Sequence, residues 1–270
     1  MNKKTGGAEV FSWALYDYAN TIFSMNIVSM YFPLWITHEM GGEDIDYSIA
    51  LSVSMVLAGL SMPVVGAASD RLRRRLPFLV AFTLISVIAT AALFISNSLV
   101  LALTIFAVAN FGYLTALVPY DSMLPEVSRG RSVGMVSGLG VGLGYLGSIG
   151  GLLMVQPFVD ASGRAASFIP TAVLFLVFSL PVFLLVREQG GEPKKRPLDI
   201  RRQYRKVWLT LNNTRRYPGL LRFLIANIVF SDAVNTIIVF MSIYASKVIG
   251  MDDKSIRTFL IASTVFAAAG

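Results

Sequence analysis

Seven long apolar segments, separated by short polar ones, dominate the chain. Crossing the hydrocarbon core of a bilayer takes about 20 predominantly apolar residues, and each segment is long enough to do so. Only 14% of the residues are charged, compared with about 25% in soluble domains. We therefore predict an all-α membrane protein with spans at Phe11–Ile36, Tyr47–Ala67, Phe78–Ile95, Leu99–Met123, Val133–Pro157, Phe168–Val186 and Leu221–Ala245.

An eighth apolar segment begins near Ser255 and continues to Gly270. At about 1.5 Å per residue it would cover about 24 Å, which is less than the roughly 30 Å hydrocarbon core. Neither a helix cap nor a flanking charge follows it. We therefore expect the chain to be truncated within this helix.

The basic residues predict an orientation in the membrane, because Lys and Arg concentrate in cytoplasmic loops. Eighteen of the 23 lie at the N-terminus and in the loops on the same side, whereas the first loop on the opposite side, 37–46, is acidic. We expect a multi-pass protein of the cell membrane with a cytoplasmic N-terminus. The first apolar run extends to Ile36 and is too long for a cleaved signal peptide. The net charge of +7 then faces the lipid bilayer, and we expect no nucleic-acid partner.

Several kinds of chemistry are excluded by composition. The chain has no cysteine and one histidine, His38, so disulfides, thiolate chemistry and a histidine cluster for zinc are ruled out. We expect neither a metal nor a cofactor. The first six predicted spans contain no Lys or Arg, which disfavours anionic substrates that need a buried cation.

Residues 187–219 interrupt the pattern of short loops with a polar, basic segment that follows six spans. Such a segment is typical of a linker between two six-helix halves. We predict an N-terminal six-helix half at 1–186, a basic cytoplasmic linker at 187–219 and the first helices of a second half at 220–270. Within the linker, Leu198–Leu211 forms either a basic helix on the anionic leaflet or a plainly solvated connection.

The first and seventh spans contain similar motifs, DYANTI from Asp17 and DAVNTI from Asp232, offset by 215 residues. Because six spans separate the motifs, both enter the membrane from the same side. This is the pattern of a parallel repeat, in which the functional site lies near the midplane between the two copies.

Each motif places an amide three residues after the carboxylate, so that Asp17 and Asn20, like Asp232 and Asn235, share a helix face. A charged Asp at the bilayer centre costs about 2.5–3.5 kcal/mol on insertion scales, and such residues usually face protein or water. We interpret the four residues as a substrate or coupling site for a proton or sodium ion. The alternative is that the two carboxylates cross-link helices through hydrogen bonds.

The fourth span adds two candidates for the same cavity, Asn110 and Tyr113, which lie three residues apart on one face. Asp121 lies near the end of that span, close to the membrane interface, where placing a carboxylate costs little free energy. We therefore expect a structural role for it. The fifth span is rich in glycine. Pairs four residues apart predict close helix packing, at Gly140, Gly144, Gly147 and Gly151.

The loop between the second and third spans reads GAASDRLRRR from Gly66. It resembles the G-x-x-x-D-R-x-G-R-R signature loop of the major facilitator superfamily, except that Arg73 stands where the signature has glycine. The resemblance implies that the loop locks the two halves of the fold and gates their motion. The simpler interpretation is a loop that only sets topology. The matching positions are Gly66, Asp70, Arg71, Arg74 and Arg75.

The opening FSWALYDYAN, from Phe11, resembles the W-A-L-Y-D-[WY]-A-N opening of the autophagy-related vacuolar amino-acid effluxer family and its prokaryotic relatives. The segments LPE at Leu124 and NTII at Asn235 are similar to segments of the same family. The resemblance implies a twelve-helix major facilitator fold and, for fungal members, efflux of neutral amino acids. We therefore predict a monomeric secondary active transporter of a small neutral or zwitterionic solute such as an amino acid, coupled to protons or sodium ions.

Three other classes of protein share some of these features. Glycoside–cation symporters of the same superfamily have a related D-x-x-N opening, so a sugar is the second substrate class. A receptor or scaffold of facilitator fold would bind without transporting. An intramembrane aspartyl protease would share the Tyr16-Asp17 pair, but Asp232 follows Val-Phe-Ser and not the Gly-x-Gly pattern of those enzymes. We therefore predict that the chain is not an enzyme.

Overall fold

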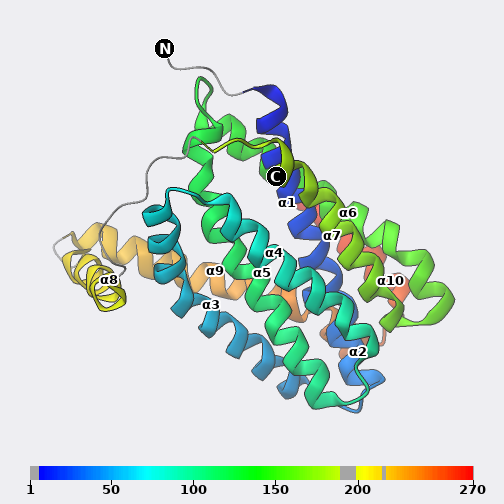
Figure 1. Ribbon diagram of the computed structural model, residues 1–270. Coiled ribbons are helices and arrows are strands. Elements are labelled where there is room, and N and C mark those ends of the chain that lie inside the picture. The colour runs from blue at the N-terminus through cyan, green and yellow to red at the C-terminus, as the bar shows by residue number, and fades with distance from the viewer. Residues whose placement is uncertain (1–5, 189–198, 215–216, 270) are drawn as a thin grey trace.

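The computed structural model describes residues 6–188, 199–214 and 217–269, and these residues form helices joined by short connections (Figure 1). In chain order the helices are α1 (Gly7–Phe23), η1 (Ser24–Tyr31), α2 (Phe32–His38), α3 (Asp44–Leu72), α4 (Leu76–Ala92), η2 (Leu93–Ile95), α5 (Leu99–Val127), α6 (Val133–Ser162), η3 (Arg164–Ser167), α7 (Phe168–Leu185), α8 (Ile200–Thr214), α9 (Pro218–Tyr244), η4 (Ala245–Ile249) and α10 (Asp253–Ala269).

Six helical stretches in the described part of the chain are long and apolar enough to cross a membrane. They are Asp44–Leu72, Leu76–Ile95, Leu99–Val127, Val133–Ser162, Arg164–Leu185 and Gly219–Ile249. The first predicted span is also helical, because α1, η1 and α2 follow one another without a break. The predicted all-α membrane fold is thus confirmed, whereas the division into two halves and a linker stays a prediction.

The helices extend beyond the apolar segments, because polar residues cap them. At the start of α3, the side chain of Glu43 accepts from the backbone of Asp46, and the Asp46 carboxylate accepts from the backbone N–H of Glu43 at 2.8 Å. This reciprocal capping box satisfies N–H groups that would otherwise lack a partner. It explains why α3 begins at Asp44, before the predicted span.

The first helical run is the centre of a bundle that comprises α1 to α7, which we call the N-terminal bundle. Helix α1 packs on α6 and α7, while α5 packs on α3 and α4. Aromatic side chains fill the space between these layers. Phe32 stacks on Phe106 with ring centroids 4.2 Å apart, and Trp13 stacks on Tyr120 at 4.5 Å. These contacts connect the first run to α5 along most of its length.

The middle of the first run, η1, is a π-helix. Such wider turns are rare and frequently mark functional sites. Two successive carbonyl oxygens of η1 accept side-chain hydrogen bonds from other helices. The Tyr47 hydroxyl donates to the oxygen of Val28 at 2.6 Å, and the Ser242 hydroxyl of α9 donates to that of Ser29. The π-helical segment therefore takes part in the contacts that α3 and α9 make with the first run.

The bundle has two ends that differ in charge. The Arg75 end carries a cluster of arginines at the end of α3 and in the turns that follow α3 and α5, whereas the His38 end carries the acidic loop before α3. The arginines are Arg71, Arg73, Arg74, Arg75, Arg129 and Arg131. Helices α9 and α10 attach to the bundle toward the His38 end, since α9 contacts η1 and α2 while α10 packs on α6.

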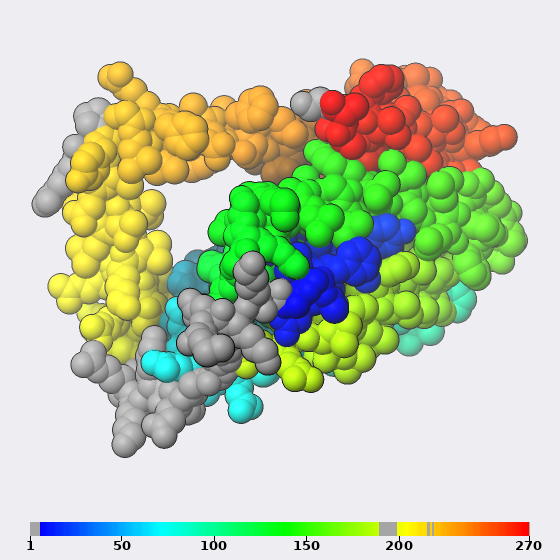
Figure 2. Space-filling view, turned by 90° about the horizontal axis from the view of Figure 1, so that it is seen from above, coloured from blue at the N-terminus to red at the C-terminus, as the bar shows by residue number. Residues whose placement is uncertain are grey.

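Toward the Arg75 end, α9 separates from the bundle. Most of its residues before Val239 are exposed, whereas Ser242 and Ile243 are buried. Figure 2, viewed from the side of the N-terminus, shows an opening enclosed by α8, α9 and the N-terminal bundle. The two groups of helices thus touch at one end and stand apart at the other.

Candidate functional site

Asp17 lies on α1 against the glycine face of α6 and is partly buried. A Cβ atom at Gly140 would collide with its Oδ2, so the absence of a side chain at that position makes room for the carboxylate. The Tyr120 hydroxyl of α5 lies within hydrogen-bonding reach of the carboxylate and also donates to the backbone oxygen of Trp13 at 3.2 Å. Asp17 is therefore held among three helices of the N-terminal bundle.

Asn20, one turn after Asp17, is buried, and its Oδ1 has no hydrogen-bond partner among the described residues. Both side-chain polar atoms of Asn26, in η1, are likewise buried without a hydrogen-bond partner among the described residues. Buried polar groups are nearly always paired, and an exception needs an explanation. The unpaired amide acceptor beside a carboxylate could coordinate a cation or a bound polar group.

The two candidates of the fourth span have different surroundings. The Asn110 amide donates to the Ser54 hydroxyl at 2.7 Å, which ties α5 to α3 inside the bundle. The ring of Tyr113 instead packs against that of Phe23, with centroids 4.9 Å apart and the ring planes tilted by 34°. Tyr113 thus reaches the first helical run, while Asn110 serves the α3–α5 contact.

Asp232 and Asn235 are exposed on the part of α9 that stands apart from the bundle. The structure does not join them to Asp17 and Asn20, because Asp17 is packed against α6 and Asp232 lies on the separated part of α9. The two halves of the repeat thus have similar motifs but different surroundings, one packed and one exposed.

A cavity of about 390 Å³ lies between the N-terminal bundle and the helices α9 and α10. Apolar side chains such as Ile237 and Phe259 form much of its wall, and its lining, among the described residues, includes no charged group. Its hydroxyl groups come from both sides, and they belong to Ser24, Ser29, Tyr145, Ser148, Ser263 and Thr264. The repeat did not indicate this set, although Ser24 lies on the same face as Asp17.

Several of these hydroxyls already donate their proton to the carbonyl of the preceding turn. Ser263 donates to Phe259 at 2.8 Å, and Thr264 donates to Leu260 at 2.8 Å. Their oxygens keep the ability to accept. The cavity wall therefore offers hydrogen-bond acceptors to a bound molecule that carries N–H or O–H groups.

Ion pairs close the His38 end across the same boundary. Arg164, just before α7, pairs with Asp253 of α10 at 2.8 Å and with Glu39 at 3.1 Å. Arg257 of α10, which is 4% exposed, lies 3.5 Å from Asp160 of α6. Lys247 pairs with Asp44, and the His38 ring bonds to the Ser246 hydroxyl at 3.0 Å. These pairs join residues far apart in the sequence and were not among the predicted contacts.

The loop at the Arg75 end forms its contacts within the N-terminal bundle. Arg75 pairs with Glu126 of α5 at 2.8 Å and, more distantly, with Asp70 at 3.8 Å. The backbone N–H groups of Arg75 and Leu76 both donate to the Glu188 carboxylate, which follows α7. Glu126 and Glu188 were not among the predicted loop partners.

The other predicted loop positions are placed as follows. Arg74 is exposed and Arg71 is partly exposed, at the end of α3. A Cβ atom at Gly66 would lie 3.7 Å from the Val118 side chain, an ordinary contact distance, so helix packing does not require glycine there. Arg73, at the signature's glycine position, adopts a left-handed conformation with φ of 53°. The turn is therefore the one that glycine would favour.

The glycines of α6 lie against α1. A Cβ atom at Gly147 would collide with the Tyr18 carbonyl oxygen and approach its Cα to 2.8 Å. At Gly151 it would lie 2.9 Å from Nδ2 of Asn26, and at Gly144 it would meet Thr21 at an ordinary 3.4 Å. The Thr21 hydroxyl donates to the carbonyl of Gly144 at 2.7 Å. Close backbone approach thus positions the Asp17 helix on α6.

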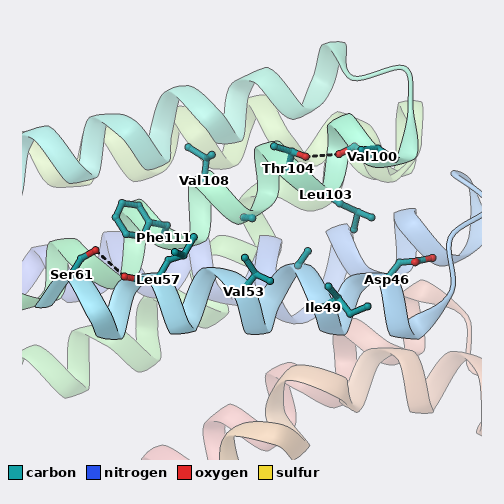
Figure 3. Close-up of a pocket in the computed structure, with 12 residues that line it drawn as sticks. Asp46, Ile49, Val53, Leu57, Ser61, Val100, Leu103, Thr104, Val108 and Phe111 are labelled. Atoms are coloured by element: carbon teal, nitrogen blue, oxygen red, sulfur yellow. Dashed lines mark hydrogen bonds between the residues drawn. The ribbon is translucent and has the colours of Figure 1, made fainter.

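A second cavity of about 600 Å³ lies between α3 and α5 (Figure 3). Its wall is mostly aliphatic. The hydroxyls of Ser61 and Thr104, which face it, donate to carbonyls of their own helices at 2.8 and 2.7 Å. Asp46 belongs to the capping box at its edge. This groove suits an apolar occupant and lacks the convergent polar groups that would orient a polar solute.

Comparison with known proteins decides the family. Residues 18–270 match the sequence profile of the Major Facilitator Superfamily. The chain belongs to this superfamily. An uncharacterized MFS-type transporter, YxiO of Bacillus subtilis (strain 168), is 30% identical over 95% of the chain and 64% of its own length. A multidrug efflux pump, Tap of Mycolicibacterium fortuitum, is 29% identical over 69% of the chain and 43% of its own length.

A further relative, an uncharacterized protein of Aquifex aeolicus (strain VF5), is 24% identical over 91% of the chain and 59% of its own length. The facilitator chain thus spans between about two fifths and two thirds of the lengths of these relatives. The superfamily is one of transporters, so the chain is grouped with transporters and not with enzymes.

Proposed function

We propose that the chain belongs to a secondary active transporter that works by alternating access and carries a small neutral or zwitterionic solute such as an amino acid. Transport is coupled to a proton or sodium ion. The protein resides in the cell membrane with its N-terminus in the cytoplasm, because the Arg75 end is the basic one. The two bodies that move are the N-terminal bundle and the body that begins with α9.

One observation carries this proposal, namely that the contacts between the two bodies are confined to one end. Ion pairs such as Arg164–Asp253 join them at the His38 end, and α9 stands apart at the Arg75 end. Alternating access needs two bodies that rock about a central site, closed on one side and open on the other. The arrangement fits a conformation that is open toward the cytoplasm.

The cavity between the two bodies supports the solute class. Its volume of about 390 Å³ is within the usual range of about 300–1,000 Å³ for small-molecule sites. Hydroxyl oxygens line it from both bodies, and its described lining has no Lys or Arg to pair with an anion. A solute with N–H or O–H donors therefore suits it best.

Asp17 is the proposed coupling residue. It is a partly buried carboxylate on α1, which continues directly into η1, and η1 supplies Ser24 to the cavity wall. The unpaired Oδ1 of Asn20 follows Asp17 one turn later. A carboxylate in this position can take up a cation at one side of the membrane and release it at the other. Asp232 and Asn235, with Tyr113, complete the proposed site when the two bodies approach one another.

Transport in proteoliposomes tests the proposal. The protein, at its full natural length, would be reconstituted and supplied with labelled amino acids, sugars and a lipophilic cation, the last because one relative is a multidrug efflux pump. We expect flux of a neutral amino acid that rises with an imposed proton or sodium gradient. Asp17→Asn should abolish the response to the gradient, whereas Asp199→Asn, at an exposed position just before α8, should retain it.

The other outcomes separate the alternatives. Gradient-driven flux of a sugar would favour a sugar–cation symporter, a reading that the hydroxyl-rich cavity wall also supports. Binding without flux of any solute would indicate a receptor or scaffold. Flux with an unchanged gradient response in Asp17→Asn would show that coupling lies elsewhere.

A further inference from the structure

Helix α8 is amphipathic and has no buried residue. At about 100° per residue, Ile200, Tyr204, Val207, Trp208 and Leu211 occupy one arc of about 100°, which we call the α8 apolar face. The four basic residues, Arg201, Arg202, Arg205 and Lys206, occupy the remaining side. Leu209 is the one large apolar residue outside the apolar face.

The α8 apolar face is strongly exposed. The exposed fraction is 69% for Trp208 and 56% for Leu211. A solvated linker would gain nothing from such an arrangement, because exposed apolar area is unfavourable in water. With 15 residues, α8 covers about 22 Å and is too short to cross the hydrocarbon core.

One contact connects this face to a membrane span. The Tyr204 hydroxyl donates to the carbonyl oxygen of Leu60 on α3 at 2.5 Å. The neighbouring side chains of α3, Val56 and Leu57, are themselves exposed and apolar, as is Leu60. The α8 apolar face therefore adjoins an apolar flank of a span, which in the membrane is in contact with acyl chains.

We propose that α8 binds the anionic surface of the bilayer, with its apolar face among the acyl chains and its four basic side chains on lipid phosphates. Charge complementarity selects this occupant, because basic side chains on an amphipathic helix are attracted to acidic lipids. Tyr204 and Trp208 supply the amphipathic rings that favour the membrane interface. The helix would thereby anchor the connection between the two bodies to the membrane while they move.

Trp208 provides the test. The two other tryptophans, Trp13 and Trp35, are 3% and 5% exposed, so Trp208 dominates quenching by water-soluble agents. The protein and its Trp208→Phe variant would be placed in nanodiscs of phosphatidylcholine alone or with phosphatidylglycerol. The difference between their emission spectra isolates Trp208. We expect acrylamide quenching of Trp208 to fall at least twofold with phosphatidylglycerol, and tail-brominated lipid to quench it.

A charge variant and its control complete the design. Arg201→Gln/Arg202→Gln/Arg205→Gln/Lys206→Gln should abolish the dependence on phosphatidylglycerol. Arg129→Gln/Arg131→Gln, in a loop at the Arg75 end, should retain it. Equal acrylamide quenching of Trp208 in both lipids would mean that α8 is solvated. Protection of Trp208 from acrylamide without quenching by brominated lipid would mean that another part of the protein covers it. Either result would overturn the proposal, as would quenching by brominated lipid that is independent of anionic lipid.

Discussion

Arg164 and Asp253 form a two-bond ion pair across the boundary between the N-terminal bundle and α10. The guanidinium Nε and Nη2 donate to the two carboxylate oxygens, each at 2.8 Å, and Nη1 donates to Glu39 at 3.1 Å. Bidentate pairs of this kind are among the stronger hydrogen-bonded contacts in proteins. Because Asp253 belongs to α10 and Arg164 to the N-terminal bundle, the pair between them can form only when the two bodies meet at the His38 end.

Arg164→Gln is expected to weaken closure at the His38 end. Loss of charged hydrogen bonds of this kind costs about 1.5–3 kcal/mol, which shifts the open-to-closed ratio by at least about tenfold. The given chain has no cysteine, and Ser242→Cys introduces one at a fully buried position on α9 that contacts η1. The protein that retains Ser242 gives the background labelling to subtract. Maleimide labelling of the cysteine at position 242 should be faster in Arg164→Gln by about the factor by which the open-to-closed ratio rises.

The control for this experiment is Lys247→Gln. The Lys247–Asp44 pair also crosses the boundary, but its side chains are 36% and 47% exposed. Exposed pairs contribute only about 0.2–1 kcal/mol, so labelling should change by a small factor. Equal labelling rates in both variants and the parent would count against an electrostatic closure.

The glycine face of α6 provides a second prediction. At Gly147 a Cβ atom would collide with backbone atoms of Tyr18, which cannot move independently of α1. At Gly142, on the same helix, it would meet nothing within 4 Å. Gly147→Ala should therefore destabilise the protein by about 1–3 kcal/mol. Gly142→Ala should be neutral or stabilising by up to about 1 kcal/mol. Thermal unfolding in detergent measures both, and equal effects would contradict the packing argument.

Helix positions were predictable because apolar runs of membrane length leave the backbone little alternative to helix. The spans therefore agree with the observed helices. The glycine periodicity predicted a close contact face, but it could not name the helix that packs on it, which in the structure is α1. The precise ends depended on polar caps such as the Glu43–Asp46 box. Within the predicted linker, Ile200–Thr214 forms helix α8, whereas residues 189–198 and 215–216, like the N-terminal Lys3 and Lys4, lie outside the described residues.

The candidate site was less predictable. Asp17 and Asp232 are equivalent in the repeat, but one is packed on α6 and the other is exposed on α9. Local motifs do not encode how far two bodies are rotated from each other. Nor does the sequence reveal the π-helical turn of η1 or the pairing of Arg164 with Glu39, 125 residues away. Such contacts arise from tertiary packing, so they had no local signal.

Arg73 provides a third prediction, because it is the one described non-glycine residue with positive φ. The left-handed conformation costs an ordinary residue about 1–2 kcal/mol, and glycine largely avoids this cost. Arg73→Gly should therefore raise stability by about 1 kcal/mol. Arg73→Ala removes the same charge but keeps the Cβ atom, so it should not raise the stability of the protein. The midpoint of thermal unfolding distinguishes these outcomes, and an equal gain in both variants would point to charge and not to conformation.

The last prediction concerns Glu188, whose carboxylate accepts from the backbone N–H groups of Arg75 and Leu76 at the start of α4. These N–H groups have no partner within their own helix. Glu188→Ala should cost about 1 kcal/mol, the usual value of a helix cap. Glu188→Gln, which keeps an acceptor but not the favourable charge at a helix N-terminus, should cost less. Hydrogen exchange locates the effect: amides at the start of α4 should exchange faster in Glu188→Ala, while those of α10 stay unchanged. Uniform acceleration throughout the protein would indicate global destabilisation and would reject the local capping role.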